Sequence, residues 1–414
     1  MGAAAAILRF YGGLADKIKG ETIPSDGNFL TITLKEPMGV AAIIIPWNSP
    51  TLMAAKTVGP ALAAGNTVLL KPAEQTSLSA LFIAHLSTLL PELPPGVLNV
   101  LPGDGRTGAM LSAHASIDKI TFTGSTEVGQ SILAASARSN LKRVTLELGG
   151  KSPLVVFEDA DVEQAARLAF AALFVSNGQV CCCGSRTYVH ASIYERFVEE
   201  TRKLALARVV GDPFSTATEQ GPQINEEAVE KVLRLIESGV REGARLVVGG
   251  RPGMKDRRAL EGGGGGQERL FIEPTVFADV TEAMTIGREE IFGPVQQIFK
   301  FETFEEAVAL ANRTRFGLAA GVVTKDAQRA LAFAKAVRAG SVWVNCYVSS
   351  RSSILNLELK GFPLQQFVVR PQTPFGGYKM SGIGREFGEA AINEYVETKT
   401  ITINMDEGGA LLFG

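Results

Sequence analysis

The sequence predicts an α/β protein in which helices cover both faces of parallel sheets. Short continuous apolar runs, such as residues 40–45 and 67–70, alternate with longer segments whose apolar residues recur at helical spacing, such as 51–64 and 77–90. Turn residues separate the two kinds of segment. Apolar strands that alternate with helices are typical of parallel sheets buried on both sides. The length of 414 residues suits two or three domains with a large core.

Composition and charge exclude several functional classes. The chain is 46% hydrophobic and 20% charged, and its net charge is −2, so nothing favours nucleic acid or an acidic membrane surface as a partner. No apolar run reaches the length that spans a bilayer, and residues 1–6 lack the basic region of a secretory signal. The four cysteines suit a reducing compartment. We therefore expect a cytoplasmic protein.

The first α/β segment, residues 39–146, places unusual residues directly after its strands. We expect strands at 40–45, 67–70, 97–101 and 117–123, and helices at 51–64, 77–90 and 128–137. Asn48 follows the first strand, Lys71 the second, Gly103 the third, and the pair Gly124 and Ser125 the fourth. Ligands of such sheets bind beyond the carboxyl ends of the strands, and the amides at a helix start can receive a phosphate. A plain turn and helix cap explains the last pair equally well.

A second α/β segment begins near residue 150. Strands are expected at 154–157, 187–189, 318–323 and 341–345, and helices at 162–174, 194–209, 226–239, 304–311 and 327–337. Residues 262–266 are five glycines, which we interpret as a surface loop.

Three consecutive cysteines, Cys181, Cys182 and Cys183, lie between two glycines in this second segment. A cysteine thiolate is a strong nucleophile when nearby donors or dipoles lower its pKa. The alternative is a buried trio that packs as small apolar residues. Three adjacent cysteines cannot all face one metal ion, so we expect no metal site.

Several motifs together resemble the NAD(P)-dependent aldehyde dehydrogenase family, and its class 1 and 2 members in particular. The run 147–153 reads Glu-Leu-Gly-Gly-Lys-Ser-Pro, and 178–181 reads Gly-Gln-Val-Cys. Further matches follow the family's order: Pro-Trp-Asn at 46–48, Lys-Pro-Ala-Glu at 71–74, Phe-Thr-Gly-Ser-Thr-Glu-Val-Gly at 122–129, Glu-Ile-Phe-Gly-Pro at 290–294 and Pro-Phe-Gly-Gly at 374–377. The likeness runs from about residue 8 to 403.

The resemblance implies a catalytic cycle on a broad range of aldehydes. Cys181 attacks the aldehyde and forms a thiohemiacetal, while the Asn48 amide and the Cys181 backbone N–H hold the oxyanion. Hydride transfer then leaves a thioester, which water activated by Glu147 hydrolyses to the carboxylic acid.

The resemblance also implies a Rossmann-like coenzyme domain that binds NAD rather than NADP. Lys71 and Glu74 would meet the adenosine ribose, where a carboxylate repels the 2′-phosphate of NADP. Glu290 would bind the nicotinamide ribose, and Phe292 would pack near the nicotinamide. The full set of implied cofactor-binding residues is Pro46, Trp47, Lys71, Glu74, Gly103, Gly124, Ser125, Gly129, Glu290 and Phe292.

The implied organisation has three parts. Residues 1–149 form the coenzyme domain and include a hairpin at about 17–36. Residues 150–380 form the catalytic domain, with an insertion at about 352–370. Residues 381–414 carry a strand at about 395–403, and this strand and the hairpin form the family's small β oligomerisation arm. A homodimer or homotetramer follows from the arm.

Three departures from the family pattern qualify this interpretation. The family carries on the order of a hundred residues, a small domain's worth, before the point at which this sequence begins, so the coenzyme domain is expected to be N-terminally truncated. A lost transit peptide would then allow an organelle in place of the cytoplasm. The insertion is expected beside the substrate entrance. Ser49, Lys56 and Val175 stand where relatives often have aromatic residues, which predicts a more open and more polar aldehyde pocket.

Two other functions compete with aldehyde oxidation. One is a catalytically impaired relative that acts as a structural or binding protein. The other is a cysteine hydrolase, which would need a histidine beside the thiol. The chain has only His85, His114 and His190, and His190 is the one nearest to the cysteines in sequence.

Overall fold

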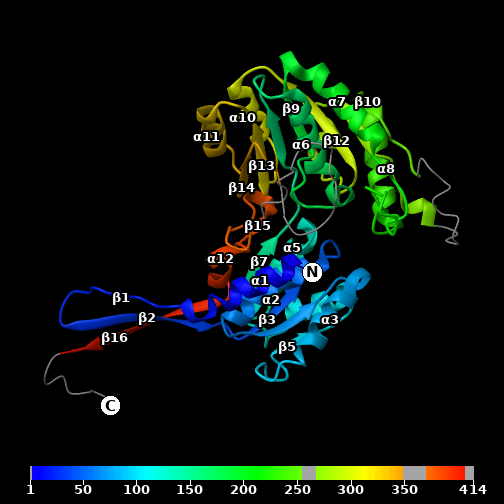
Figure 1. Ribbon diagram of the computed structural model, residues 1–414. Coiled ribbons are helices and arrows are strands. Elements are labelled where there is room, and N and C mark those ends of the chain that lie inside the picture. The colour runs from blue at the N-terminus through cyan, green and yellow to red at the C-terminus, as the bar shows by residue number, and fades with distance from the viewer. Residues whose placement is uncertain (1, 254–266, 348–369, 406–414) are drawn as a thin grey trace. The chain divides into compact units, whose positions relative to one another are not determined.

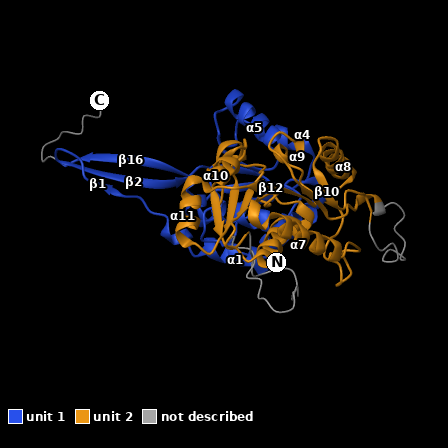
Figure 2. Ribbon diagram, turned by 90° about the horizontal axis from the view of Figure 1, so that it is seen from above, with its two compact units in different colours: residues 1–146, 370–374, 384–414 blue, residues 147–369, 375–383 orange. Residues whose placement is uncertain are grey.

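The computed structural model describes residues 2–253, 267–347 and 370–405 and divides into two compact units (Figures 1 and 2). The first unit comprises residues 1–146, 370–374 and 384–414, and the second comprises 147–369 and 375–383. The mixed α/β class predicted from the sequence is confirmed. The expected insertion at about 352–370, apart from Arg370, and the glycine run at 262–266 lie outside the described residues.

The first unit is built around a sheet with strand order β7-β6-β3-β4-β5. β3 pairs in parallel with β4 and β6, and β4 pairs in parallel with β5. Apolar side chains on both faces of β3 are buried, and Val68 and Leu70 are buried on one face of β4, which explains the apolar sequence of these strands. The strands are β3 (Val40–Ile44), β4 (Thr67–Lys71), β5 (Leu98–Val100), β6 (Lys119–Thr123) and β7 (Arg143–Glu147).

Two helices of the first unit, α4 and α5, begin at residues whose side chains cap them. Asp104 accepts a hydrogen bond from Arg106 N at the start of α4, and Ser125 accepts one from Val128 N at the start of α5. Gly59 lets α1 approach α2, since a Cβ there would lie 2.8 Å from the Tyr11 ring. The helices are α1 (Gly2–Gly12), α2 (Pro50–Ala63), α3 (Ser77–Ser87), α4 (Gly105–Ala113), α5 (Thr126–Arg138) and α12 (Gly388–Asn393).

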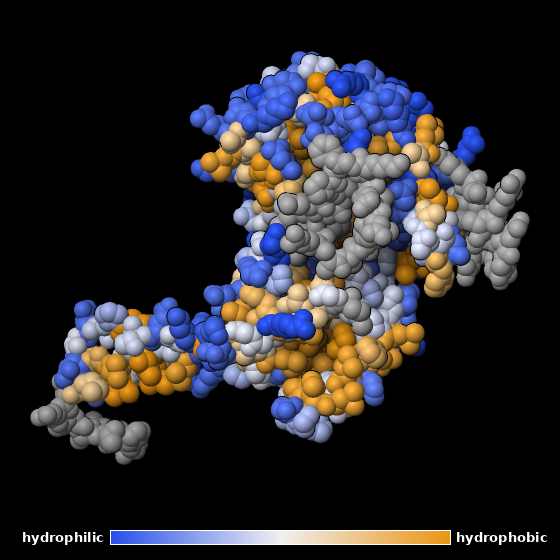
Figure 3. Space-filling view, viewed as in Figure 1, coloured by the Kyte–Doolittle hydropathy of each residue, from blue (hydrophilic) through white to orange (hydrophobic). Residues whose placement is uncertain are grey.

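The apolar residues of α3 do not form a core. Leu78 is 81% exposed and Phe82 is 47% exposed, and Ala80 is the helix residue that is buried. Apolar residues gather on the surface over α3 and β5 (Figure 3). Because β5 ends the strand order of this sheet, α3 covers an edge strand and leaves its own outer face uncovered by described residues.

A separate antiparallel sheet forms an arm of the first unit (Figure 1). Its order is β1 (Thr22–Ile23), β2 (Phe29–Pro37) and β16 (Val396–Asn404). β16 pairs with β2 over its whole length, from Val396 opposite Pro37 to Asn404 opposite Phe29. The arm exposes several large apolar side chains (Figure 3): Ile23, Phe29, Leu30, Leu34 and Ile403.

The second unit contains a larger sheet of order β10-β11-β12-β9-β8-β13-β14, in which β10 is antiparallel to β11 and the other pairs are parallel. The strands are β8 (Pro153–Val156), β9 (Arg186–His190), β10 (Arg245–Val248), β11 (Thr275–Ala278), β12 (Val295–Phe301), β13 (Ala319–Val323) and β14 (Ser341–Val344). The helices are α6 (Val162–Phe174), α7 (Tyr194–Ala207), α8 (Glu226–Arg241), α9 (Thr285–Arg288), α10 (Phe304–Asn312) and α11 (Ala327–Ala336). Its core includes Val155, Phe277, Ile286 and Phe333.

Within the described ranges, no helix is both long enough and apolar enough to cross a membrane. The same part of the chain holds no group of three or more His, Cys, Asp or Glu side chains placed to bind a metal ion.

Candidate active site

Cys181 lies on a turn between α6 and β9. The helix ends at Phe174, and Ser176, Asn177 and Gly178 then take positive φ angles of 48°, 62° and 74°. Asn177 tolerates this conformation and ties the turn down, because its side chain donates to Pro222 O and accepts from Gly221 N. The left-handed residues reverse the chain, so that Cys181 precedes β9 rather than continuing the helix.

The three cysteines differ in burial. Cys181 is partly exposed, whereas Cys182 and Cys183 are 3% and 6% exposed, and no disulfide joins them. Burial raises the pKa of Cys183, and its Sγ lies 3.3 Å from Leu173 O. Of the three cysteines, Cys181 is therefore the one that is not buried.

The segment from Glu147 to Lys151 lies directly against the cysteine turn. Glu147 is the last residue of β7 and is 3% exposed. A Cβ at Gly150 would lie 2.4 Å from Cys181 O, so the two backbones touch only because residue 150 is glycine. The sequence motif Glu-Leu-Gly-Gly therefore brings the predicted base and the predicted nucleophile onto adjoining backbone segments.

Glu290 and Phe292 border the same place. Glu290 Oε1 accepts a hydrogen bond from Gly150 N at 3.0 Å. Phe292 has a φ of 59°, a conformation rarely adopted by a bulky residue and one that clusters at functional sites. A small cavity in the second unit is lined by Gly150, Cys181, Glu290 and Phe292, among others.

A network of buried polar side chains lies next to this region. The sequence analysis did not predict this network. Lys151 is 1% exposed, and its Nζ donates to Gln297 Oε1 at 2.8 Å. Burial and the positive charge of Arg186 lower the pKa of Lys151 to about 7. The Arg186 guanidinium is fully buried and donates to Lys151 O and to the carbonyls of Leu310 and Ala311. Because Lys151 belongs to a motif, it could have been singled out; Arg186 carried no such signal.

The predicted coenzyme residues of the first unit lie at the carboxyl edge of its sheet. Pro46, Trp47 and Asn48 follow β3, and Lys71 ends β4. Lys71 is 4% exposed, and burial lowers its pKa against the opposing charges of Glu74 and Asp104.

The loops that contain Gly103 and Gly124 lie at the same carboxyl edge of the first unit's sheet. Gly103 follows β5, where a Cβ would lie 2.2 Å from Thr107 Oγ1. Gly124 follows β6, Ser125 caps α5, and Gly129 is buried inside that helix. Asn48 belongs to this unit and Cys181 to the other, so their joint role at an oxyanion stays a prediction.

Lys56 stays only a predicted residue of the aldehyde pocket, and the structure gives it a buried partner in the first unit. It is buried inside α2 at 4% exposure and forms an ion pair with Glu386, which is 3% exposed. Thr123 Oγ1 lies 3.4 Å from the same carboxyl group. The sequence did contain an indication of this ion pair. A lysine inside an apolar helical run is expected to be buried, and a buried charge normally needs a partner.

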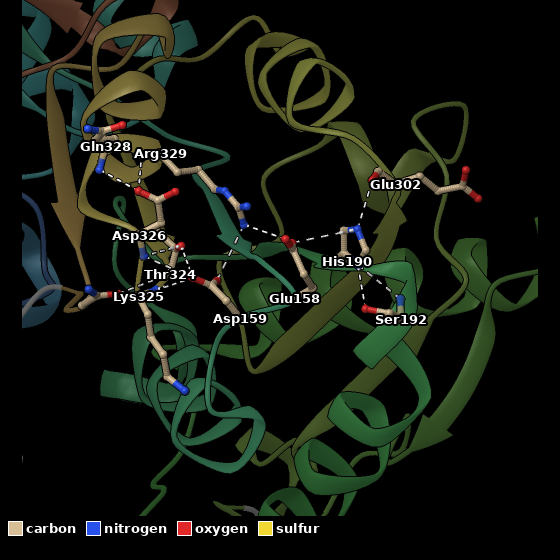
Figure 4. Close-up of polar contacts among 11 residues, drawn as sticks. Glu158, Asp159, His190, Ser192, Glu302, Thr324, Lys325, Asp326, Gln328 and Arg329 are labelled. Carbon is tan, nitrogen blue, oxygen red and sulfur yellow. Dashed lines mark hydrogen bonds and ion pairs between the residues drawn. The ribbon is translucent and has the colours of Figure 1, made fainter.

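His190 lies at the other end of β9 from Cys181. It ends the strand, where its ring contacts Ser192 Oγ at 2.8 Å and Glu302 O at 3.0 Å (Figure 4). Cys181 precedes the first residue of the same strand. His190 therefore does not partner the thiol, which removes the main candidate base for a cysteine hydrolase.

Comparison with known proteins places the chain in a family. The aldehyde dehydrogenase family matches residues 1–362 and 365–401. Retinal dehydrogenase 2 of Gallus gallus is 51% identical over 403 residues, which cover 97% of this chain and 71% of that protein. The mitochondrial aldehyde dehydrogenase of Mesocricetus auratus is 50% identical over 401 residues, covering 97% and 74%.

Comparison with solved structures indicates the same family. A NAD+ complex of aldehyde dehydrogenase from Bacillus cereus superimposes with a TM-score of 0.88 at 41% identity and covers 98% of this chain and 76% of that one. The chain belongs to the aldehyde dehydrogenase family. The resemblance inferred from the motifs is therefore confirmed, and a catalytically impaired relative is not favoured.

Proposed function

We propose that this protein oxidises aldehydes to carboxylic acids with NAD, and that Cys181 is its nucleophile. The observation that carries the proposal is the packing of Gly149 and Gly150, which joins the Glu147 segment, the Cys181 turn and Glu290 around one cavity. A partly exposed cysteine, a buried carboxylate on the adjoining segment and a dinucleotide-type sheet form a set that suits this reaction.

In the proposed cycle, the Cys181 thiolate attacks the aldehyde carbon and forms a thiohemiacetal. The Asn48 side-chain amide and the Cys181 backbone N–H donate to the oxyanion. Bound NAD supplies the hydride acceptor. Glu147 then takes a proton from water, which attacks the thioester and releases the acid and the free thiol.

The residues of the first unit fit NAD. A lysine and a carboxylate, Lys71 and Glu74, suit ribose hydroxyls, and the start of α5 after Gly124 and Ser125 suits a pyrophosphate. The negative charge of Glu74 favours NAD over NADP. The relative from Bacillus cereus is described as an NAD+ complex, which supports the same choice.

The arm of β1, β2 and β16 supports a homodimer or homotetramer. Its exposed apolar residues on a long paired strand are the kind of surface that a second copy covers.

We place the protein in the cytoplasm, although one relative is named as mitochondrial, so an organelle is the competing location. The relatives' names include a retinal and a general aldehyde dehydrogenase, so we propose a broad aldehyde range.

The test is NADH formation from NAD and a short aliphatic aldehyde, followed by ultraviolet absorbance. Wild-type protein should form NADH, and Cys181→Ala should not. The matched control is Cys182→Ala, which removes a buried thiol of the same run and should keep activity if the protein folds. Folded wild-type protein that forms no NADH with a panel of aliphatic and aromatic aldehydes would refute the proposal.

A further inference from the structure

The Glu290 carboxyl group is seated against the glycine pair of the Glu147 segment. Its Oε1 accepts from Gly150 N at 3.0 Å. A Cβ built at Gly149 would lie 2.3 Å from Oε2, so the second oxygen also rests on this segment. The φ angle of Gly149 is open to any residue, since it lies outside the left-handed range. Space for the carboxylate, rather than backbone conformation, therefore requires glycine at position 149.

The other side of the glycine pair faces the nucleophile. A Cβ at Gly150 would lie 2.4 Å from Cys181 O and 3.3 Å from the Leu318 side chain. The pair is thus held between the carboxylate of Glu290 and the backbone of Cys181. Only Leu148 separates it from Glu147, so a shift of the pair would move the carboxylate that activates water.

We propose that Glu290 is a positioning residue for the general base, in addition to its predicted contact with the nicotinamide ribose. Its carboxylate accepts the Gly150 amide and fixes the segment that carries Glu147 beside Cys181. A hydrogen bond from a backbone N–H to a carboxylate is charge-assisted and about twice as strong as a neutral one. This inference rests on the proposed function, because it assigns Glu147 the role of base.

The two roles of Glu290 separate when no cofactor is present. An activated ester such as p-nitrophenyl acetate acylates the Cys181 thiol and releases p-nitrophenolate. Water then attacks the thioester and releases acetate, restoring the thiol. The first step needs the nucleophile and the second needs the positioned base, but neither needs NAD. A residue that serves only the cofactor would leave both steps unchanged.

Burst kinetics with this ester provide the first measurement. Glu290→Ala should keep the burst amplitude and slow the steady-state rate about tenfold or more, in line with the loss of a charged hydrogen bond. Glu290→Gln keeps an acceptor oxygen and should retain most of the rate. Gly149→Ala places a methyl group where Oε2 lies and should reproduce the Glu290→Ala defect. Glu289→Gln is the matched control, since Glu289 is exposed and pairs with Arg315.

Hydrogen exchange provides a second measurement that does not depend on activity. The Gly150 amide should exchange about tenfold or more faster in Glu290→Ala and Gly149→Ala than in wild type. Wild-type ester kinetics and wild-type exchange in both variants would overturn the proposal. If wild type shows neither an ester burst nor NADH formation, the proposed function fails, while the exchange rates still decide whether Glu290 holds the segment.

Discussion

Replacing Lys151 with methionine should change how stability depends on pH. Lys151 is fully buried beneath the active site, with its Nζ on Gln297 Oε1. Burial is the main cause that lowers its pKa from the ordinary 10.5 to about 7 in the folded protein, and the nearby Arg186 charge lowers it further, against Glu290 and Glu289. Methionine keeps an unbranched apolar stem but cannot titrate.

The sign of the effect follows from the direction of the shift. A lysine with a depressed folded-state pKa disfavours folding fully below about pH 7, where the unfolded and the folded chain both carry the charge. The penalty is relieved as the pH rises from about 7 towards 10.5, because the folded chain gives up its proton first. Each pH unit in this window should raise the free energy of unfolding by about 1.4 kcal/mol. No solvent screening reduces this figure, because the side chain is fully buried.

Urea unfolding at constant ionic strength, measured between about pH 7 and about pH 9, would test this expectation. The difference in unfolding free energy between wild type and Lys151→Met should move in favour of wild type by about 2 kcal/mol across the range, because the folded-state lysine is already half deprotonated at the lower end. Lys325→Met is the control, because Lys325 is exposed, and it should give a flat difference. A flat difference for Lys151→Met would refute the reasoning, since it would mean that this lysine keeps an ordinary pKa.

Three further outcomes are expected. Glu147→Gln should keep the ester burst but slow acid release by about a hundredfold, measured as steady-state turnover, because general base catalysis contributes about that much; unchanged turnover would assign the base elsewhere. Lys71→Met should raise the Kd for NAD measured by calorimetry, and equal affinity would place the adenosine ribose away from Lys71. Glu386→Gln should lower the free energy of unfolding by about 3 kcal/mol, because it leaves Lys56 buried without its ion partner; adding Lys56→Met should restore part of that loss, and a strictly additive double variant would contradict the pairing.

The sequence was sufficient for the fold class and for the residues that follow strands in the first unit. The alternation of apolar runs and helical periods is dictated by burial on both sheet faces, so it can be read directly. It was less informative for α3, where apolar spacing predicted a common face but the structure exposes Leu78 and Phe82. Periodicity reports which residues share a face; it does not report what covers that face.

The partners of buried charged residues could not be predicted from the sequence. Lys56 and Glu386 are 330 residues apart in sequence, so their pairing depends on tertiary packing alone. Arg186 is similar, because its guanidinium reaches carbonyls of α10 that lie 124 and 125 residues away. A lone charged residue in an apolar run predicts that a partner exists, but only the folded chain identifies the partner.

The predicted site residues lie at the carboxyl edge of the first unit's sheet and at the amino edge of the second unit's sheet. This difference follows from whether each motif comes after or before its strand in the sequence. In the first unit the functional residues follow strands, as Lys71 follows β4 and Ser125 follows β6. In the second unit they precede strands, as Lys151 precedes β8 and Cys181 precedes β9.

Other polar side chains lie at the carboxyl edge of the second sheet. Asp159 accepts from Thr324 Oγ1 and from two backbone amides after β13, while Glu158 pairs with Arg329 (Figure 4). These contacts lie at the edge at which ligands of open α/β sheets usually bind. Whether a motif lies before or after its strand therefore indicates, from the sequence alone, at which edge of its sheet the predicted site residues lie.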